Sequence, residues 1–144
     1  MSQRAPPRAV VLDTNVALDL LLFRDPSTLA LAQELADGTL VWYATAAMRA
    51  ELARVLGYPA LQAWLARRGF DADQVLAQFD HLCRIHPDVA TGVPRCSDPD
   101  DQKFIDLALA LRAMLLSKDH AVLSLRAALA GRGVTVAAQF SVAA

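Results

Sequence analysis

The 144-residue chain has few cysteines, few lysines and no long apolar run. Its two cysteines, Cys83 and Cys96, are too few and too far apart for a CxxC or zinc pattern, so we expect ordinary thiols in a reducing cytoplasm. Apolar runs such as residues 20–23 are far too short to span a bilayer. Residues 1–8 are polar and lack the apolar core of a signal peptide. These features predict a cytoplasmic protein without a membrane segment.

Strong charge of either sign is also missing. The formal net charge is −1, so no global basic field indicates nucleic-acid binding, although a local basic groove remains compatible with it. Arginine outnumbers lysine by twelve to two; arginine suits phosphate contacts, but genomic base composition explains the bias equally well. The chain has no glycine-rich phosphate loop and no recognisable Ser–His–Asp spacing. With 55% hydrophobic and 20% charged residues, it is typical of one globular domain.

Short apolar stretches alternate with helical patterns along the chain. We expect a flexible tail over residues 1–8 and a single domain over residues 9–144. This alternation predicts an α/β fold with a central, mainly parallel sheet of four to five strands and helices on both faces. The expected strands are 9–12, 40–44, 82–85, 114–117 and 134–136. The expected helices are 16–23, 25–38, 45–56, a short one around Leu61 to Leu65, 71–81, 98–112 and 124–130.

Asp13 follows the first expected strand directly. Ligands bind at the carboxyl ends of strands in open parallel sheets, so Asp13 falls where such folds carry out chemistry. Asn15, two residues later, could hold Asp13 or a ligand through its amide. The alternative is that Asp13 or Thr14 simply caps the next helix. The position of other carboxylates decides between these interpretations.

Glu51 lies on or beside the buried stripe of the helix after the second strand. Met48, Leu52 and Val55 surround it at helical spacing. A carboxylate there is costly unless it is paired or binds a metal. The alternative is an exposed Glu51 that pairs with Arg54 at i+3, which would contribute only a few tenths of a kcal/mol.

Two further acidic residues, Asp101 and Asp119, are expected near Asp13 at the carboxyl ends of the strands. Asp101 is in the first turn of the helix opened by Asp98 and Pro99, on the face of its apolar residues. The alternative is a capping acid that answers Asp98, but three aspartates in four residues exceed what a cap requires. Asp119 ends the fourth expected strand as Asp13 ends the first.

Such a carboxylate cluster repels itself without a cation. Hard oxygen ligands with no nearby Cys or His set favour Mg²⁺ or Mn²⁺ over zinc. The most economical use of that ion is assisted attack of water on a phosphodiester. The residues therefore predict a metal site formed by Asp13, Glu51, Asp101 and Asp119.

Four segments together resemble the PIN-domain family. They are Val-Val-Leu-Asp13-Thr-Asn15, Glu51 in its helix, Ser97-Asp98-Pro-Asp100-Asp101-Gln-Lys-Phe104 and Leu-Leu-Ser117-Lys-Asp119, in the family's order over nearly the whole chain. The resemblance is closest to the toxin branch of toxin–antitoxin pairs. It implies a Rossmann-like sheet and a Mg²⁺- or Mn²⁺-dependent ribonuclease. It also implies RNA as substrate, an antitoxin protein as partner and a possible homodimer.

Carried over by position, the resemblance implies Asp13, Glu51, Asp101 and Asp119 as catalytic and metal-binding residues, supported by Asn15, Ser117 and Asp98. Ser117 matches the small hydroxyl residue that orients the last Asp. Many relatives carry a further acid where this chain has Ala121, which puts a second tightly held metal in doubt. Asp98 or Asp100 could compensate.

Two other functions stay open at this point. A phosphohydrolase could use Asp13 as nucleophile, but the expected Asp-x-Asp pattern is Asp-Thr-Asn here. A catalytically degenerate PIN fold could bind nucleic acid or a protein partner without turnover, and Ala121 gives that alternative some weight.

Overall fold

The computed structural model of the chain describes residues 6–141. Within that span five strands form one sheet in the order β3-β2-β1-β4-β5, and every neighbouring pair runs parallel. The strands are β1 (Arg8–Leu12), β2 (Leu40–Ala44), β3 (Cys83–Ile85), β4 (Met114–Leu116) and β5 (Val136–Ala137). The predicted α/β class and parallel sheet are therefore confirmed.

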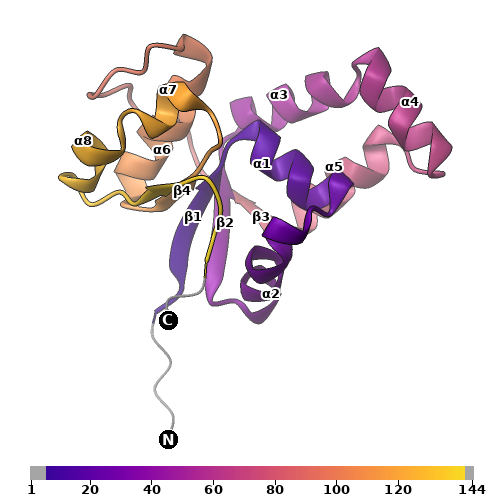
Figure 1. The fold of residues 1–144 in the computed structure, drawn as a ribbon, viewed down its shortest axis with the longest axis horizontal. Helices are drawn as coiled ribbons and strands as arrows, with labels where there is room; N and C mark the ends of the chain where they lie inside the picture. The colour runs from indigo at the N-terminus through magenta and orange to yellow at the C-terminus, as the bar shows by residue number, and fades with distance from the viewer. Residues whose placement is uncertain (1–5, 142–144) are drawn as a thin grey trace, which may run out of the picture.

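Helices cover both faces of this sheet. In Figure 1, α1 to α5 lie on one side of the strands, and α6, α7 and α8 lie on the other. The helical segments are α1 (Thr14–Leu18), the π-helical η1 (Asp19–Phe23), the 3-10 turn η2 (Pro26–Thr28), α2 (Leu29–Asp37), α3 (Ala46–Leu56), α4 (Pro59–Arg67), α5 (Ala72–Leu82), the 3-10 turn η3 (Pro99–Asp101), α6 (Gln102–Leu111), α7 (His120–Leu123) and α8 (Arg126–Ala130). The result is a three-layer sandwich.

Strand β1 lies at the centre of the sheet because the chain changes direction beside it. The chain first builds β2 and β3 on one side of β1, then returns through α6 to place β4 on the other side. Val10 and Val11 of β1 are fully buried, as expected for a strand covered on both faces. The reversal places a crevice at the carboxyl ends of β1 and β4, where such sheets bind ligands.

Several boundaries differ from the sequence prediction. Arg8 already pairs in β1, and residues 1–5 of the expected tail lie outside the described residues. The helix expected over 16–23 divides into α1 and a wider π-helical turn, which buries the three consecutive residues Leu20, Leu21 and Leu22. The helix expected over 124–130 is the shorter α8, over Arg126–Ala130, and α7, over His120–Leu123, is a further helix that the sequence did not predict.

The last strand begins later than expected because of the turn before it. Gly133 has a φ of 86°, and the Val134 backbone N–H donates to the Leu129 carbonyl at 3.0 Å. These contacts keep residue 134 in the turn that follows α8, so pairing with β4 is confined to Val136–Ala137 rather than 134–136.

Candidate active site

A groove of about 490 Å³ opens at the carboxyl ends of β1 and β4. Acidic side chains from four separate segments meet in it: Asp13 after β1, Glu51 in α3, Asp101 in η3 and Asp119 after β4. We call this cavity the carboxylate groove; its lining residues are Asp13, Thr14, Asn15, Leu18, Phe23, Glu51, Val55, Tyr58, Leu61, Asp101, Phe104 and Asp119. The fold thus brings together four acids that span more than a hundred positions of sequence.

Asp13 is the most deeply buried of these acids, with 4% of its surface exposed. Its Oδ1 accepts a hydrogen bond from the Val16 backbone N–H at 2.8 Å, which caps α1. Its Oδ2 accepts a hydrogen bond from the Ser117 hydroxyl at 2.5 Å. Burial raises the pKa of Asp13, and both hydrogen bonds oppose that rise. The cap interpretation and the site interpretation are therefore compatible.

Ser117 joins the two strand ends. Besides donating to Asp13, its fully buried Oγ accepts a hydrogen bond from the Asp119 backbone N–H at 3.1 Å. Asp119 is half-buried, and its Oδ1 caps α7 by accepting from the Ala121 N–H at 2.9 Å. Ser117 thereby fixes Asp119 through the main chain and Asp13 through the side chain.

Asp98, Asp101 and Asp119 form the tightest acidic cluster in the described chain. One carboxylate oxygen from each lies within 4.8 Å of the others. Asp101 Oδ2 is buried and has no hydrogen-bond partner within residues 6–141. Burial, followed by the neighbouring Asp119 and then the charges of Asp98 and Asp13, raises the pKa of Asp101 to about 7. Without a cation, Asp101 is therefore about half protonated near pH 7.

Asp98 also has a local structural role. Its Oδ1 accepts from the Asp100 backbone N–H at 3.0 Å and begins η3. Asp98 caps η3 without a reciprocal bond from Asp101, and Asp101 makes no cap bond in α6, so Asp101 is not the capping acid considered as an alternative from the sequence.

Glu51 is paired on both of its oxygens. Lys103 Nζ lies 2.8 Å from Oε1, and the Thr14 hydroxyl donates to Oε2. The Glu51 side chain is 15% exposed, whereas Arg54, 3.8 Å away, is 66% exposed. Screening by water makes that distant, exposed pair weak, so Lys103 rather than Arg54 is the main partner of Glu51. Lys103 also donates to the Asp100 carbonyl at 2.6 Å, which links α3 to the η3 segment.

Two buried polar residues of α6 hold the loop that leads into the acidic cluster. Gln102 accepts a hydrogen bond from the Cys96 N–H at 2.6 Å and donates to the Pro94 carbonyl at 3.2 Å. Asp106 accepts from Gln102 at 2.9 Å and from the Gly92 N–H at 3.1 Å. We call Gln102 and Asp106 the α6 clamp. Sequence reasoning missed it, although two polar residues at i and i+4 on an apolar helix face were a usable signal.

Asn15 lines the groove but is exposed, and no hydrogen bond joins its side chain to Asp13 or to another residue of the described chain. The sequence suggested that the Asn15 amide could hold Asp13, but the hydrogen bond to Asp13 comes from the Ser117 hydroxyl instead. The Asn15 amide stays available to a ligand.

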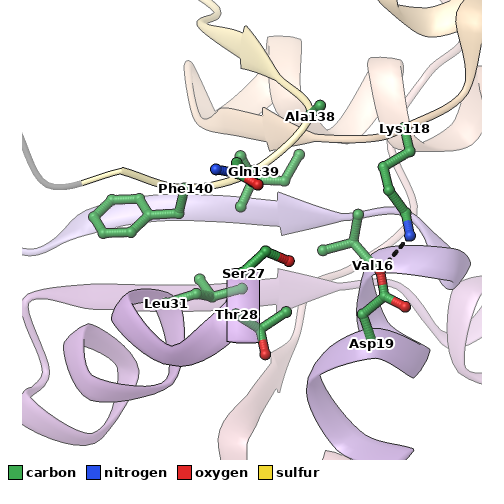
Figure 2. A pocket seen from close by; sticks show the side chains of 10 residues that line it. Val16, Asp19, Ser27, Thr28, Leu31, Lys118, Ala138, Gln139 and Phe140 are labelled. Carbon is green, nitrogen blue, oxygen red and sulfur yellow. Dashed lines mark hydrogen bonds and ion pairs between the residues drawn. The ribbon is translucent and has the colours of Figure 1, made fainter. Parts of the chain in front are cut away.

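A second cavity, of about 80 Å³, lies beside α1 and the chain after β5. Figure 2 shows Lys118 directed at Asp19 at one end of it and Phe140 at the other. This ion pair raises the pKa of Lys118 and engages its ammonium group outside the carboxylate groove. Lys118 therefore does not neutralise the acidic cluster by direct pairing, although it adjoins Asp119 in sequence.

The comparisons with known proteins agree with this geometry. A family model described as PIN domain matches residues 9–121, a span that contains every acid of the groove. No curated protein sequence matches the chain. Among the helices of residues 6–141, none has both the length and the apolar character needed to cross a membrane.

Proposed function

Because the chain belongs to the PIN-domain family, whose members are generally nucleases, we propose that it is a metal-dependent endoribonuclease. The observation that carries this proposal is the convergence of Asp13, Glu51, Asp101 and Asp119 on one groove. Acids that gather in this way need a cation to offset their mutual repulsion. A phosphodiester is the substrate whose hydrolysis such a cation assists most directly.

The donor set fits a hard divalent ion such as Mg²⁺ or Mn²⁺. All candidate ligands are carboxylate oxygens, and the buried Asp101 Oδ2 has no hydrogen-bond partner within the described chain. We propose that Asp98, Asp101 and Asp119 hold the ion together with Asp13. A bound Mg²⁺ or Mn²⁺ would lower the pKa of an attacking water and offset the developing charge on the phosphate.

The remaining polar residues would act by positioning. Ser117 keeps one oxygen of Asp13 and the main chain of Asp119 in fixed orientations. Glu51 has Lys103 on one oxygen and Thr14 on the other, which favours a role in orienting water or substrate over direct metal ligation. The Asn15 amide would donate to a phosphate oxygen at the mouth of the groove.

The test is cleavage of a mixed-sequence single-stranded RNA with Mg²⁺, with Mn²⁺ or with EDTA. Wild type should cleave only with metal, and Asp13→Asn should lower the rate by at least about 100-fold, because charge stabilisation of several kcal/mol is lost. Asparagine can still cap α1, so the fold should persist. Asp37→Asn is the matched control, since Asp37 is an exposed acid at the end of α2 and does not line the groove.

Failure to cleave would favour the alternative function, a PIN-fold binding module without turnover. The observation behind that alternative is that Ala121 supplies only its backbone N–H to Asp119. The family resemblance leads us to expect a further acid at this position. Full activity of Asp13→Asn would instead refute the assignment of the site.

The biological role that we propose from the resemblance is that of a cytoplasmic toxin with a cognate antitoxin protein, and we propose a homodimer as its assembly. Induced expression of wild type should arrest growth of a bacterial host, and Asp13→Asn should not. Normal growth with folded, active wild-type protein would contradict the toxin role while leaving the nuclease activity intact.

A further inference from the structure

The carboxylate groove is lined by two unlike sets of side chains. The four acids and Asn15 form the polar set, which we call the acidic wall. The apolar set, which we call the apolar wall, consists of Leu18, Phe23, Val55, Tyr58, Leu61 and Phe104. An occupant of this groove therefore meets charged or polar atoms as well as apolar surface.

Two aromatic rings form the exposed part of the apolar wall. Phe23 is 41% exposed and Tyr58 is 50% exposed, whereas Phe104 is only 2% exposed. Large aromatic side chains left open beside a cavity gain most when a flat apolar ligand covers them. The exposed rings of Phe23 and Tyr58 are therefore the part of this wall that can bind a flat apolar ligand.

Both rings are carried on ordered main chain. The Tyr58 N–H donates to the Val55 carbonyl at 3.0 Å, and its own carbonyl accepts from the Gln62 N–H at 2.9 Å. Phe23 packs edge-to-face on Trp64, with ring centroids 5.0 Å apart. The Arg68 guanidinium lies 3.7 Å from the Trp64 ring centroid, a second contact that holds the Trp64 ring. This support holds the Phe23 ring in place before a ligand arrives, which reduces the entropy lost on binding.

We propose that Phe23 and Tyr58 form a base-binding wall for single-stranded nucleic acid. The inference rests on the proposed nuclease function and specifies how that site holds its substrate. A nucleotide carries both kinds of group. Its phosphate would bind the ion held by the acidic wall, and its flat base would bind the exposed rings of the apolar wall. Bases stack on aromatic side chains with little sequence preference. In a duplex the bases are stacked and paired, so their faces are not available to such a wall.

The test is fluorescence anisotropy with a short labelled RNA, single-stranded or as a blunt duplex, in Mg²⁺ and in an Asp13→Asn background that prevents cleavage. Phe23→Ala and Tyr58→Ala should each weaken single-strand binding by about 5- to 150-fold, the loss expected for one stacked base. Tyr58→Phe should retain the parent affinity, and Tyr58→Leu, which keeps apolar bulk without a ring, should not. Duplex binding should be weaker in the parent and unchanged by these substitutions.

Phe70→Ala is the matched control, because Phe70 is 49% exposed but lines a different cavity, between η1 and α5. Equal losses for Phe70→Ala would overturn the proposal. Unchanged single-strand affinity in both groove variants would also overturn it and leave a protein segment as the occupant of the wall. With Asp13 intact, the groove variants should raise KM and leave kcat nearly unchanged.

This design separates the two proposals. Ring-dependent binding of single strands by a protein that never cleaves would support the base-binding wall and contradict the nuclease. Cleavage that ignores both rings would support the nuclease and overturn the wall.

Discussion

Ser117 is the residue on which the two strand-end aspartates depend. Its hydroxyl is fully buried and bonded on both sides, to Asp13 Oδ2 and to the Asp119 N–H. Ser117→Ala would leave a buried carboxylate oxygen without a donor. We expect a loss of about 1–3 kcal/mol in the free energy of unfolding, measured by urea denaturation.

The matched control for that substitution is Ser124→Ala. Ser124 is exposed and donates to the Ala121 carbonyl, so its removal should change stability by less than about 0.5 kcal/mol. Equal stability of Ser117→Ala and wild type would show that Asp13 finds another donor.

The raised pKa of Asp101 predicts how the free energy of unfolding depends on pH in the absence of metal. Its pKa in the folded protein is about 7, against 3.8 in an unfolded chain, so the native state binds more protons between these values. Stability should therefore fall as pH rises from about 4 to about 7, and the favourable contribution of the protonated Asp101 should be lost above that range.

Asp101→Asn removes this titration. In EDTA, the variant should lose less stability than wild type between about pH 5 and pH 8, measured by thermal denaturation across that range. At the upper end it should be the more stable protein, since an amide does not repel Asp119. Parallel pH profiles of the two proteins would contradict the assignment.

At the scale of single elements, α6 positions the acidic cluster through its clamp. Gln102 and Asp106 bond to the loop at Gly92, Pro94 and Cys96, just before Asp98. Gln102→Leu removes the bonds to Pro94 and Cys96 with little change in volume and leaves the bond from Gly92 to Asp106 in place. We expect Mn²⁺ affinity to fall by about 10- to 100-fold, the effect typical of residues that support metal ligands, measured by calorimetric titration.

Gln62→Leu provides the control for that experiment. Gln62 also donates a side-chain bond to a carbonyl, that of Leu56 at 2.9 Å, but it lies in α4 and does not line the groove. Unaltered Mn²⁺ affinity in Gln102→Leu would mean that the loop keeps its position without the clamp.

The elements differ in how far the sequence predicts them. Strands β1 and β2 and the capped starts of α3 and α5 follow from local patterns, such as the Asp71 and Gln74 capping box, and they are confirmed. The π-helical turn and the late start of β5 depend on hydrogen bonds that a hydrophobic pattern does not report.

The same limit applies within the site. Asp13 and Asp119 are recognisable because each follows an apolar strand, and the groove does bring them together. The partner of Glu51 is Lys103, 52 residues away, rather than the nearer Arg54. Local spacing favours Arg54, whereas the pairing with Lys103 exists only after α6 packs near α3.

At the scale of the whole molecule, the site is a property of the folded state alone. The four acids come from distant segments, so an unfolded chain cannot hold one ion with all of them. Metal should therefore stabilise the fold, by about 2.7 kcal/mol at a free concentration one hundred times the Kd. Thermal denaturation with increasing Mn²⁺ should show this shift in wild type and in Asp37→Asn. Asp119→Asn should show little or none, and an equal shift in that variant would place the ion elsewhere.

The central position of β1 has a consequence for biosynthesis. The Ser117 hydroxyl that holds Asp13 lies 104 residues further along the chain. At ordinary rates of translation, the ribosome needs roughly 5–20 s to pass from one to the other. Throughout that interval β1 lacks its neighbour β4, and Asp13 lacks both its hydroxyl donor and Asp119. A nascent chain therefore stays without a complete carboxylate groove until nearly all of the sheet has been synthesised.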